Sequence, residues 1–197
     1  MSLRRQASAA SVEDPRIDRT RQAVREATLQ VLATDGYAGF TLEKVAASAR
    51  VARSTLYRHW PSRIELVADA VAGLNRQPDA TPAVGTARQR AHVLVEHLIE
   101  AFASSKVADA MPALVEAAAR SPEVATFLHE FAASRRRALT DAIAEGVQTG
   151  ELDPRLDPDL AARALAGAVM YSRFMTPEAL APEQAEELVT TVLGPAE

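Results

Sequence analysis

The sequence predicts an all-α protein. Apolar residues recur at three- and four-residue spacing along most of the chain, which is the period of a helix that buries one face. No segment shows the strict alternation of a half-buried strand, and no internal repeat is present. Three segments combine an N-cap residue, a proline and an acidic residue, which is typical of helix starts. They are Ser121-Pro122-Glu123, Asp157-Pro158-Asp159 and Thr176-Pro177-Glu178.

Composition narrows the classes of function. A chain of 197 residues is long enough for one or two domains with a sizeable core. The absence of cysteine excludes disulfides, thiolate metal sites and cysteine nucleophiles. No apolar run approaches the roughly 18 residues needed to span a bilayer, and no signal-peptide core is present. We therefore expect a cytoplasmic protein that has no membrane partner.

Charge is distributed unevenly along the chain. Residues 1–76 contain 12 Lys/Arg and 8 Asp/Glu, a balance of +4, whereas residues 77–197 contain 10 and 18, a balance of −8. A basic amino-terminal module on an acidic body is the layout expected of a DNA-binding protein whose other half has a different task. Chance clustering of charges is the alternative explanation.

The amino-terminal segment predicts an arm followed by a helix. Residues 1–15 lack periodicity and are predicted to form a flexible arm, either an ordinary disordered terminus or one whose arginines contact DNA. The following helix should end at Asp35-Gly36, since glycine suits the left-handed position after a helix. Its apolar stripe consists of Ala23, Val24, Ala27, Val31 and Leu32.

Residues 41–60 are the most informative segment, because they predict two short helices joined by a tight turn. Thr41 suits the N-cap of the first helix. The second helix is polar and basic on the side away from Leu56 and Trp60. Such a pair can lay one helix across a DNA backbone and the next into the major groove. A generic helical hairpin with solvated charges is the alternative. A capping-box sequence, Ser62 to Glu65, then opens a helix over 63–75.

The carboxy-terminal part predicts a helical bundle. Residues 76–85 have the Pro and Gly content of a linker, and helices are expected near 86–105, 107–119, 122–149, 158–175 and 182–193. Small residues in the helix 158–175 permit close approach, so this helix and the last one suit a tight interface, within one subunit or between two. The candidate interface residues are Leu165, Ala168, Val169, Ser172, Leu188, Val189 and Val192.

Large and polarizable side chains are concentrated in the same half. They form either an ordinary core or the lining of an apolar ligand pocket. The candidate lining residues are Phe102, Met111, Phe127, Phe131, Met170, Tyr171 and Phe174.

The remaining polar features predict neither a metal site nor a catalytic site. His92 and Glu96 share a helix face, but no third ligand follows at a fixed spacing, so no metal is expected. The arginines at 135–137 are predicted to be a solvated helix face. No nucleophile motif, phosphate loop or catalytic carboxylate pair is present, so we expect neither enzymatic activity nor a cofactor.

Residues 17–75 resemble the DNA-binding domain of the tetracycline-repressor (TetR) family of bacterial transcription regulators. The resemblance is carried by the first helix, by the STLYRHW core at residues 54–60 with its spacing from Thr41, and by the following WPSRIELVADAVAGL. Two positions depart from the family pattern. Arg50 stands in place of the usual turn glycine, and Ala52 removes the usual N-cap of the second helix, at a cost of about 1 kcal/mol.

The resemblance implies a DNA-binding domain at 16–76, with its helix-turn-helix at 41–60, and a regulatory and dimerisation domain at 77–197. It implies a homodimer that binds a palindromic operator in double-stranded DNA. Such proteins are usually repressors, and a small apolar or amphipathic effector releases them from the operator. A regulator without an effector and an all-α enzyme or carrier remain alternatives. The base-reading side chains are expected among Arg53, Ser54, Thr55 and Arg58. The complete set of implied DNA contacts is Thr41, Lys44, Arg53, Ser54, Thr55, Tyr57, Arg58, His59 and Arg63.

Overall fold

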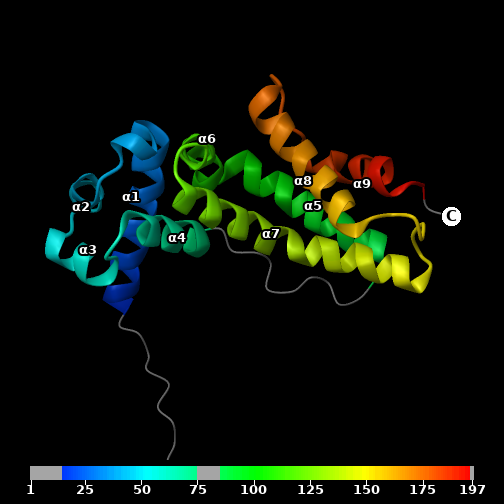
Figure 1. The fold of residues 1–197 in the computed structure, drawn as a ribbon, viewed down its shortest axis with the longest axis horizontal. Coiled ribbons are helices and arrows are strands. Elements are labelled where there is room, and N and C mark those ends of the chain that lie inside the picture. The colour runs from blue at the N-terminus through cyan, green and yellow to red at the C-terminus, as the bar shows by residue number, and fades with distance from the viewer. Residues whose placement is uncertain (1–14, 75–84, 196–197) are drawn as a thin grey trace, which may run out of the picture.

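The computed structural model describes residues 15–74 and 85–195, and every regular element among them is helical. The predicted arm and linker lie almost wholly outside these residues. Figure 1 shows α1–α4 at one end, α5, α7, α8 and α9 bundled at the other, and α6 between them. The elements are α1 (Pro15–Gly39), α2 (Leu42–Ala49), α3 (Arg53–His59), α4 (Arg63–Leu74), α5 (Ala87–Ser104), α6 (Lys106–Ala118), α7 (Pro122–Thr149), α8 (Pro158–Met175), a 3-10 turn (Pro182–Gln184) and α9 (Ala185–Leu193).

The predicted fold class is confirmed, and one predicted helix start is wrong. No helix begins at Thr176, where the backbone is extended with φ −118° and ψ 155°. The Thr176 hydroxyl donates to the carbonyl oxygens of Ser172 at 2.7 Å and Glu178 at 2.8 Å. Thr176 therefore satisfies the Ser172 carbonyl at the end of α8, and helical structure resumes only at Pro182.

The first helix is interrupted where the sequence predicts its end. Gly36 has φ 67° and ψ 172°, which breaks the regular helix before the chain turns towards α2. Positive φ is accessible to glycine at low cost, which explains this residue type at the break. The predicted apolar stripe is buried, apart from Ala23, which is exposed.

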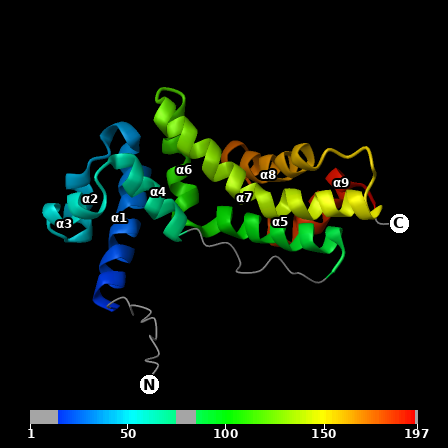
Figure 2. The same cartoon turned by 60° about the horizontal axis from the view of Figure 1, so that its bottom comes forward.

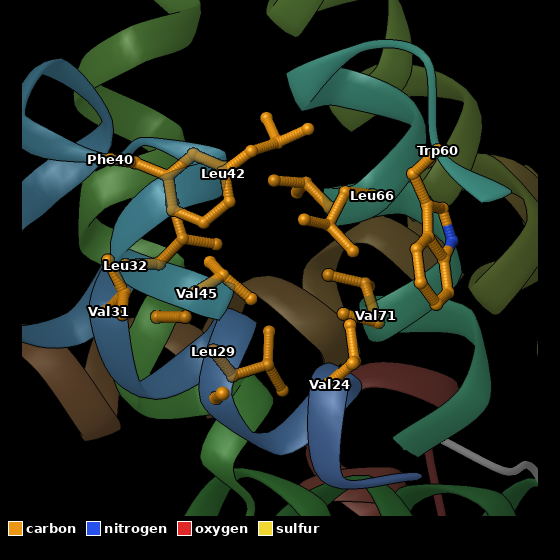
Figure 3. Close-up of a cluster of buried hydrophobic side chains, with 14 of the residues drawn as sticks. Val24, Leu29, Val31, Leu32, Phe40, Leu42, Val45, Trp60, Leu66 and Val71 are labelled. Carbon is orange, nitrogen blue, oxygen red and sulfur yellow. The ribbon is translucent and has the colours of Figure 1, made fainter. Parts of the chain in front are cut away.

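A first hydrophobic cluster joins the amino-terminal helices to α6. Figure 3 shows Phe40, Val45 and Leu66 facing one another in its interior, and all three are fully buried. α6 adds side chains to the same cluster, among them Val107 and Met111. The core below the helix-turn-helix is therefore not confined to the residues that precede the linker.

A second cluster holds α5, α7, α8 and α9 together. Figures 1 and 2 show α5 and α7 running side by side. Gly146 of α7 permits this approach, because a β-carbon there would lie 2.5 Å from Cβ of Ala87. Glu151 caps α5, since its carboxylate accepts from the backbone N–H groups of Ala87 at 2.8 Å and Arg88 at 3.1 Å.

None of the helices in the described ranges is both long enough and apolar enough to cross a membrane.

Candidate functional site

The turn between α2 and α3 is built around a left-handed arginine. Arg50 has φ 56° and ψ 42°, so the turn accepts a side chain where the resembled family places glycine. The N–H of Val51 donates to the Ala46 carbonyl at 3.0 Å, and that of Arg50 donates to the Ala47 carbonyl at 3.3 Å. These bonds close α2, although a left-handed non-glycine residue costs roughly 1–2 kcal/mol.

The start of α3 lacks a side-chain cap, as the sequence predicts. Ala52 occupies the N-cap position with φ −69° and ψ 141°, and no side chain accepts a hydrogen bond there. The N–H groups of Thr55 and Leu56 donate only to the Ala52 carbonyl, at 3.0 and 3.4 Å. The first turn of α3 therefore keeps unsatisfied donors that water or an anion can use.

α3 lies at the outer edge of the molecule (Figures 1 and 2), and its exposed side chains are polar. Its apolar anchors are buried, Leu56 completely and Trp60 with 6% exposure. Burying these two side chains fixes which side of α3 faces outward. The exposed residues are Arg53, Ser54, Tyr57, Arg58 and His59, with Thr55 half-buried.

Among the implied DNA contacts, Tyr57 and Lys44 make side-chain hydrogen bonds to neighbouring helices. The Tyr57 hydroxyl donates to Glu43 Oε1 at 2.8 Å, which braces α3 against α2. This bond lowers the pKa of the Glu43 carboxyl and raises the pKa of the Tyr57 hydroxyl. Lys44 Nζ donates to Asp35 Oδ2 at 2.6 Å and to the Gly39 carbonyl at 2.9 Å. A phosphate contact by either side chain would have to replace or share these bonds.

Arg63 is directed inward. Its guanidinium carbon lies 4.5 Å from the ring centroid of Tyr37 and 5.7 Å from that of Phe40. It also donates to the Tyr37 carbonyl oxygen, and its Nε is buried without a hydrogen-bond partner. Arg63 thus joins the start of α4 to the end of α1, and a DNA contact by its side chain would have to replace or share these interactions.

A cavity of about 310 Å³ lies between α5, α6, α7 and α8. Predicted lining residues that border it are Phe102, Met111, Phe131 and Met170. Tyr171 does not border it, because its side chain is 62% exposed on the outer side of α8. Phe127 and Phe174 pack against the first hydrophobic cluster and are also absent from the lining. Four of the seven candidate lining residues therefore border a cavity, and three do not.

The cavity also has polar lining residues that the sequence analysis missed. Arg135 and Arg136 border it, so the predicted solvated face at 135–137 applies only to the exposed Arg137. Burial lowers the pKa of the Arg135 guanidinium from its ordinary value. A usable signal existed in the sequence, since Phe131 and Leu139 lie four residues on either side of Arg135 and therefore share its helix face.

α6 separates the cavity from the core of the amino-terminal helices. Val107 and Met111 both line the cavity and belong to the first hydrophobic cluster. Next to them, Lys106 Nζ pairs with Glu26 Oε2 of α1 at 2.7 Å. α6 is therefore in contact with both the cavity and α1.

Three predicted interface residues are buried inside the chain. Leu165, Val169 and Val189 belong to the second cluster, with exposures of 0%, 3% and 1%. The remaining candidates, Ala168, Ser172, Leu188 and Val192, are half-buried. Because their side chains already pack against this chain, Leu165, Val169 and Val189 offer no surface to a partner.

The outer face of α8 carries an apolar stripe that the sequence analysis did not single out. Large exposed side chains lie at both of its ends, with Leu160 63%, Tyr171 62% and Met175 70% exposed. Ala164 and Gly167 lie between them and are also exposed. Spacings of three and four residues place all five on one side of the helix.

No metal-binding group of three ligands occurs within residues 15–74 and 85–195. The single His–Glu pair noted in the sequence, His92 and Glu96, lies 3.9 Å apart.

Both halves of the chain match models of known protein families. Residues 24–70 match the family model "Bacterial regulatory proteins, tetR family", and residues 81–192 match "Tetracyclin repressor-like, C-terminal domain". An HTH-type transcriptional regulator of Mycobacterium tuberculosis is 28% identical over 169 residues, which are 85% of this chain and 83% of the relative.

Solved structures share the fold. FadR from Bacillus subtilis, determined with stearoyl-CoA, has a TM-score of 0.73 at 18% identity and covers 87% of this chain and 97% of its own. AibR, determined with isovaleryl coenzyme A and operator DNA, has a TM-score of 0.65 at 21% identity and covers 89% and 99%. With both family models matched in order along the chain, the protein belongs to the TetR family of transcriptional regulators.

Proposed function

We propose that this TetR-family regulator is a cytoplasmic homodimeric repressor, released from a palindromic operator by an amphipathic effector. The effector binds in the cavity between α5, α6, α7 and α8. The observation that carries this proposal is the position of α6, because Val107 and Met111 contact both the cavity and the core of the DNA-binding helices. We assign it no enzymatic activity and no cofactor.

The DNA-binding role rests on the outer face of α3. Arg53 and Arg58 are exposed there and can donate two hydrogen bonds each to a guanine edge. Thr41 and His59 flank this face and suit phosphate contacts. Because such binding neutralises phosphates, operator affinity should fall steeply with salt.

The dimer rests on the outer stripe of α8. Leu160, Tyr171 and Met175 are large apolar side chains that are exposed in the single chain, and exposed apolar patches mark interaction sites. Ala164 and Gly167 between them allow a second helix to approach closely. A two-fold axis through this stripe presents two α3 helices to DNA, so the operator should have two related half-sites about one helical turn apart, roughly 34–36 Å.

The proposed effector role is supported by the cavity and by two related structures. The structures of FadR and AibR were determined with acyl-coenzyme A molecules, and that of AibR also contains operator DNA. The cavity of this chain has the volume and the apolar walls of a small ligand site. A ligand that shifts α6 also shifts α1, and with it the distance between the two α3 helices.

Selection of bound duplexes from a random DNA library tests the proposal. We expect the purified protein to enrich an imperfect palindrome. Arg58→Ala should weaken binding and relax base preference at one position of each half-site, by about 1–3 kcal/mol. Arg137→Ala, an exposed arginine on α7, is the matched control and should bind like the native protein. Failure to enrich any sequence would refute the DNA-binding role.

A further inference from the structure

We propose that the effector has an anionic head group on an apolar chain, and that Arg136, with Arg135 beside it, binds the head. This inference rests on the proposed function and specifies the chemistry of the ligand at the same cavity. It changes the expectation from the sequence, which placed the arginines at 135–137 on a solvated helix face.

The walls of the cavity suit an alkyl chain. Leu98, Phe102 and Met170 contribute apolar surface from α5 and α8, and Met111 and Phe131 do so from α6 and α7. A volume of about 310 Å³ lies at the lower end of the range for small-molecule pockets, roughly 300–1,000 Å³, and therefore favours a short chain. A chain of about eight carbons with a small head group meets this requirement.

Arg136 has unused hydrogen-bonding capacity at the cavity. Its side chain is 24% exposed, and its Nε is buried without a hydrogen-bond partner. Its nearest carboxylate is Asp159, with Arg136 Nη2 and Asp159 Oδ1 3.9 Å apart, beyond hydrogen-bonding distance. Asp159 is already bonded by Arg163. A buried donor without an acceptor is costly, so an anion that accepts from Arg136 relieves this cost.

Arg135 adds to the positive potential. Its guanidinium carbon lies 5.3 Å from the ring centroid of Phe131, which also lines the cavity. Burial disfavours the charged form of Arg135, and a nearby anion would offset that effect. The lining residues include no aspartate or glutamate, while His97 and His129 can only add positive charge. This arrangement favours anionic ligands and disfavours cationic ones.

The anionic head group can belong to either of two kinds of molecule, a free carboxylic acid or an acyl-coenzyme A. A free carboxylate would place its two oxygens on Arg136. An acyl-coenzyme A thioester would place its chain in the cavity and its phosphates outside. Val115 is 48% exposed and His129 is exposed, so the cavity reaches the surface beside these two lining residues.

Calorimetric titration with four eight-carbon molecules tests the inference. Octanoate, octan-1-ol, octylamine and octanoyl-coenzyme A share a chain and differ in head group. We expect octanoate or octanoyl-coenzyme A to bind at least about tenfold more tightly than octan-1-ol, and octylamine to bind most weakly, since a charged hydrogen bond contributes roughly this factor. The better of the two anions identifies the source of the head group.

Variants at neighbouring arginines locate the head group. Arg136→Gln should remove most of the preference of octanoate over octan-1-ol and leave the binding of octan-1-ol within about twofold, as expected for loss of one charged contact. Unchanged octan-1-ol binding shows that the variant is folded. Arg136→Lys should retain part of the preference because it keeps the charge. Arg137→Gln is the matched control and should leave all four affinities unchanged.

Two results would separate the inference from the proposed function. If octan-1-ol binds as tightly as the anions and releases selected operator DNA, the head-group inference is wrong and the effector role stands. If the anions bind with the Arg136 dependence but leave operator binding unchanged, the head-group inference stands and effector control is wrong. If none of the four molecules binds, the inference is overturned.

Discussion

The substitution Gly167→Gln distinguishes an α8 whose outer face contacts solvent from an α8 whose outer face contacts a second subunit. A β-carbon at Gly167 would meet no atom within 4 Å in the single chain. Replacing glycine in a helix interior by a good helix former stabilises a helix by roughly 0.5–1 kcal/mol. For a chain of this length, that gain corresponds to an increase in melting temperature of about 1–4 °C.

If the dimer forms through the outer stripe of α8, the same substitution destabilises the interface between the subunits. The glutamine side chain would then lie where the partner helix approaches most closely. Overpacking a close contact costs about 1–3 kcal/mol. That cost corresponds to a dimer dissociation constant increased roughly 5- to 150-fold, at 1.4 kcal/mol for each factor of ten. We therefore expect a more stable single chain that associates less well and binds operator poorly at low concentration.

Sedimentation equilibrium, together with thermal unfolding at several protein concentrations, measures both effects. Ala133→Gln on the exposed side of α7 controls for the added side chain and should leave association unchanged. Gly146→Ala should destabilise the chain at every concentration, because its β-carbon would lie 2.5 Å from Cβ of Ala87 and 2.8 Å from Cδ1 of Leu152. If Gly167→Gln raises the melting temperature without weakening the dimer, the outer face of α8 is not the interface.

Three further changes test local features. Ala52→Ser should supply the missing cap of α3 and raise the free energy of unfolding by about 1 kcal/mol; urea titration without such a gain would show that the cap is not limiting. Arg63→Gln should lower the melting temperature but leave the slope of log affinity against log salt unchanged, whereas a phosphate contact would reduce that slope by about one. Asp69 binds Arg25 at 2.9 and 3.1 Å, and although burial raises the pKa of Asp69, the hydrogen bonds and charge of Arg25 lower it overall. The stabilisation from this ion pair is therefore present above the ordinary carboxyl pKa of about 4 and is lost as the pH falls below it. Asp69→Asn should therefore reduce the loss of unfolding free energy at acidic pH. A stability–pH curve parallel to that of the native protein would contradict this.

Local sequence patterns were sufficient to predict most helices and the turn of the helix-turn-helix. Pro158 after Asp157 marks the start of α8 because capping chemistry acts within a few residues. The same reasoning failed at Thr176, where the hydroxyl bonds back to α8 instead of opening a helix. A threonine can close one helix or begin the next, and only tertiary structure decides between these roles.

Properties that depend on packing between distant helices were harder to predict. Arg63 is one of the implied DNA contacts, and its position over the rings of Tyr37 and Phe40 could not be predicted from local sequence spacing. The sequence predicts Arg136 to be one of three solvated arginines, whereas the packing of α7 against α5 and α8 places it at the cavity. Likewise, the small residues of the helix 158–175 predicted a close contact without showing which side of α8 the chain itself buries. Sequence spacing defines a face, and the neighbouring helices determine what that face contacts.

Coupling between the cavity and DNA is tested most directly by reciprocal titration. The dissociation constant of octanoate, or of the tightest eight-carbon ligand, is measured with and without saturating selected operator duplex, and operator affinity is measured with and without the ligand. We expect both affinities to fall by the same factor, on the order of 100-fold or about 2.7 kcal/mol, because coupling between two sites is reciprocal. Equal affinities in the presence and absence of the other molecule would contradict control through α6 and leave a constitutive DNA-binding protein.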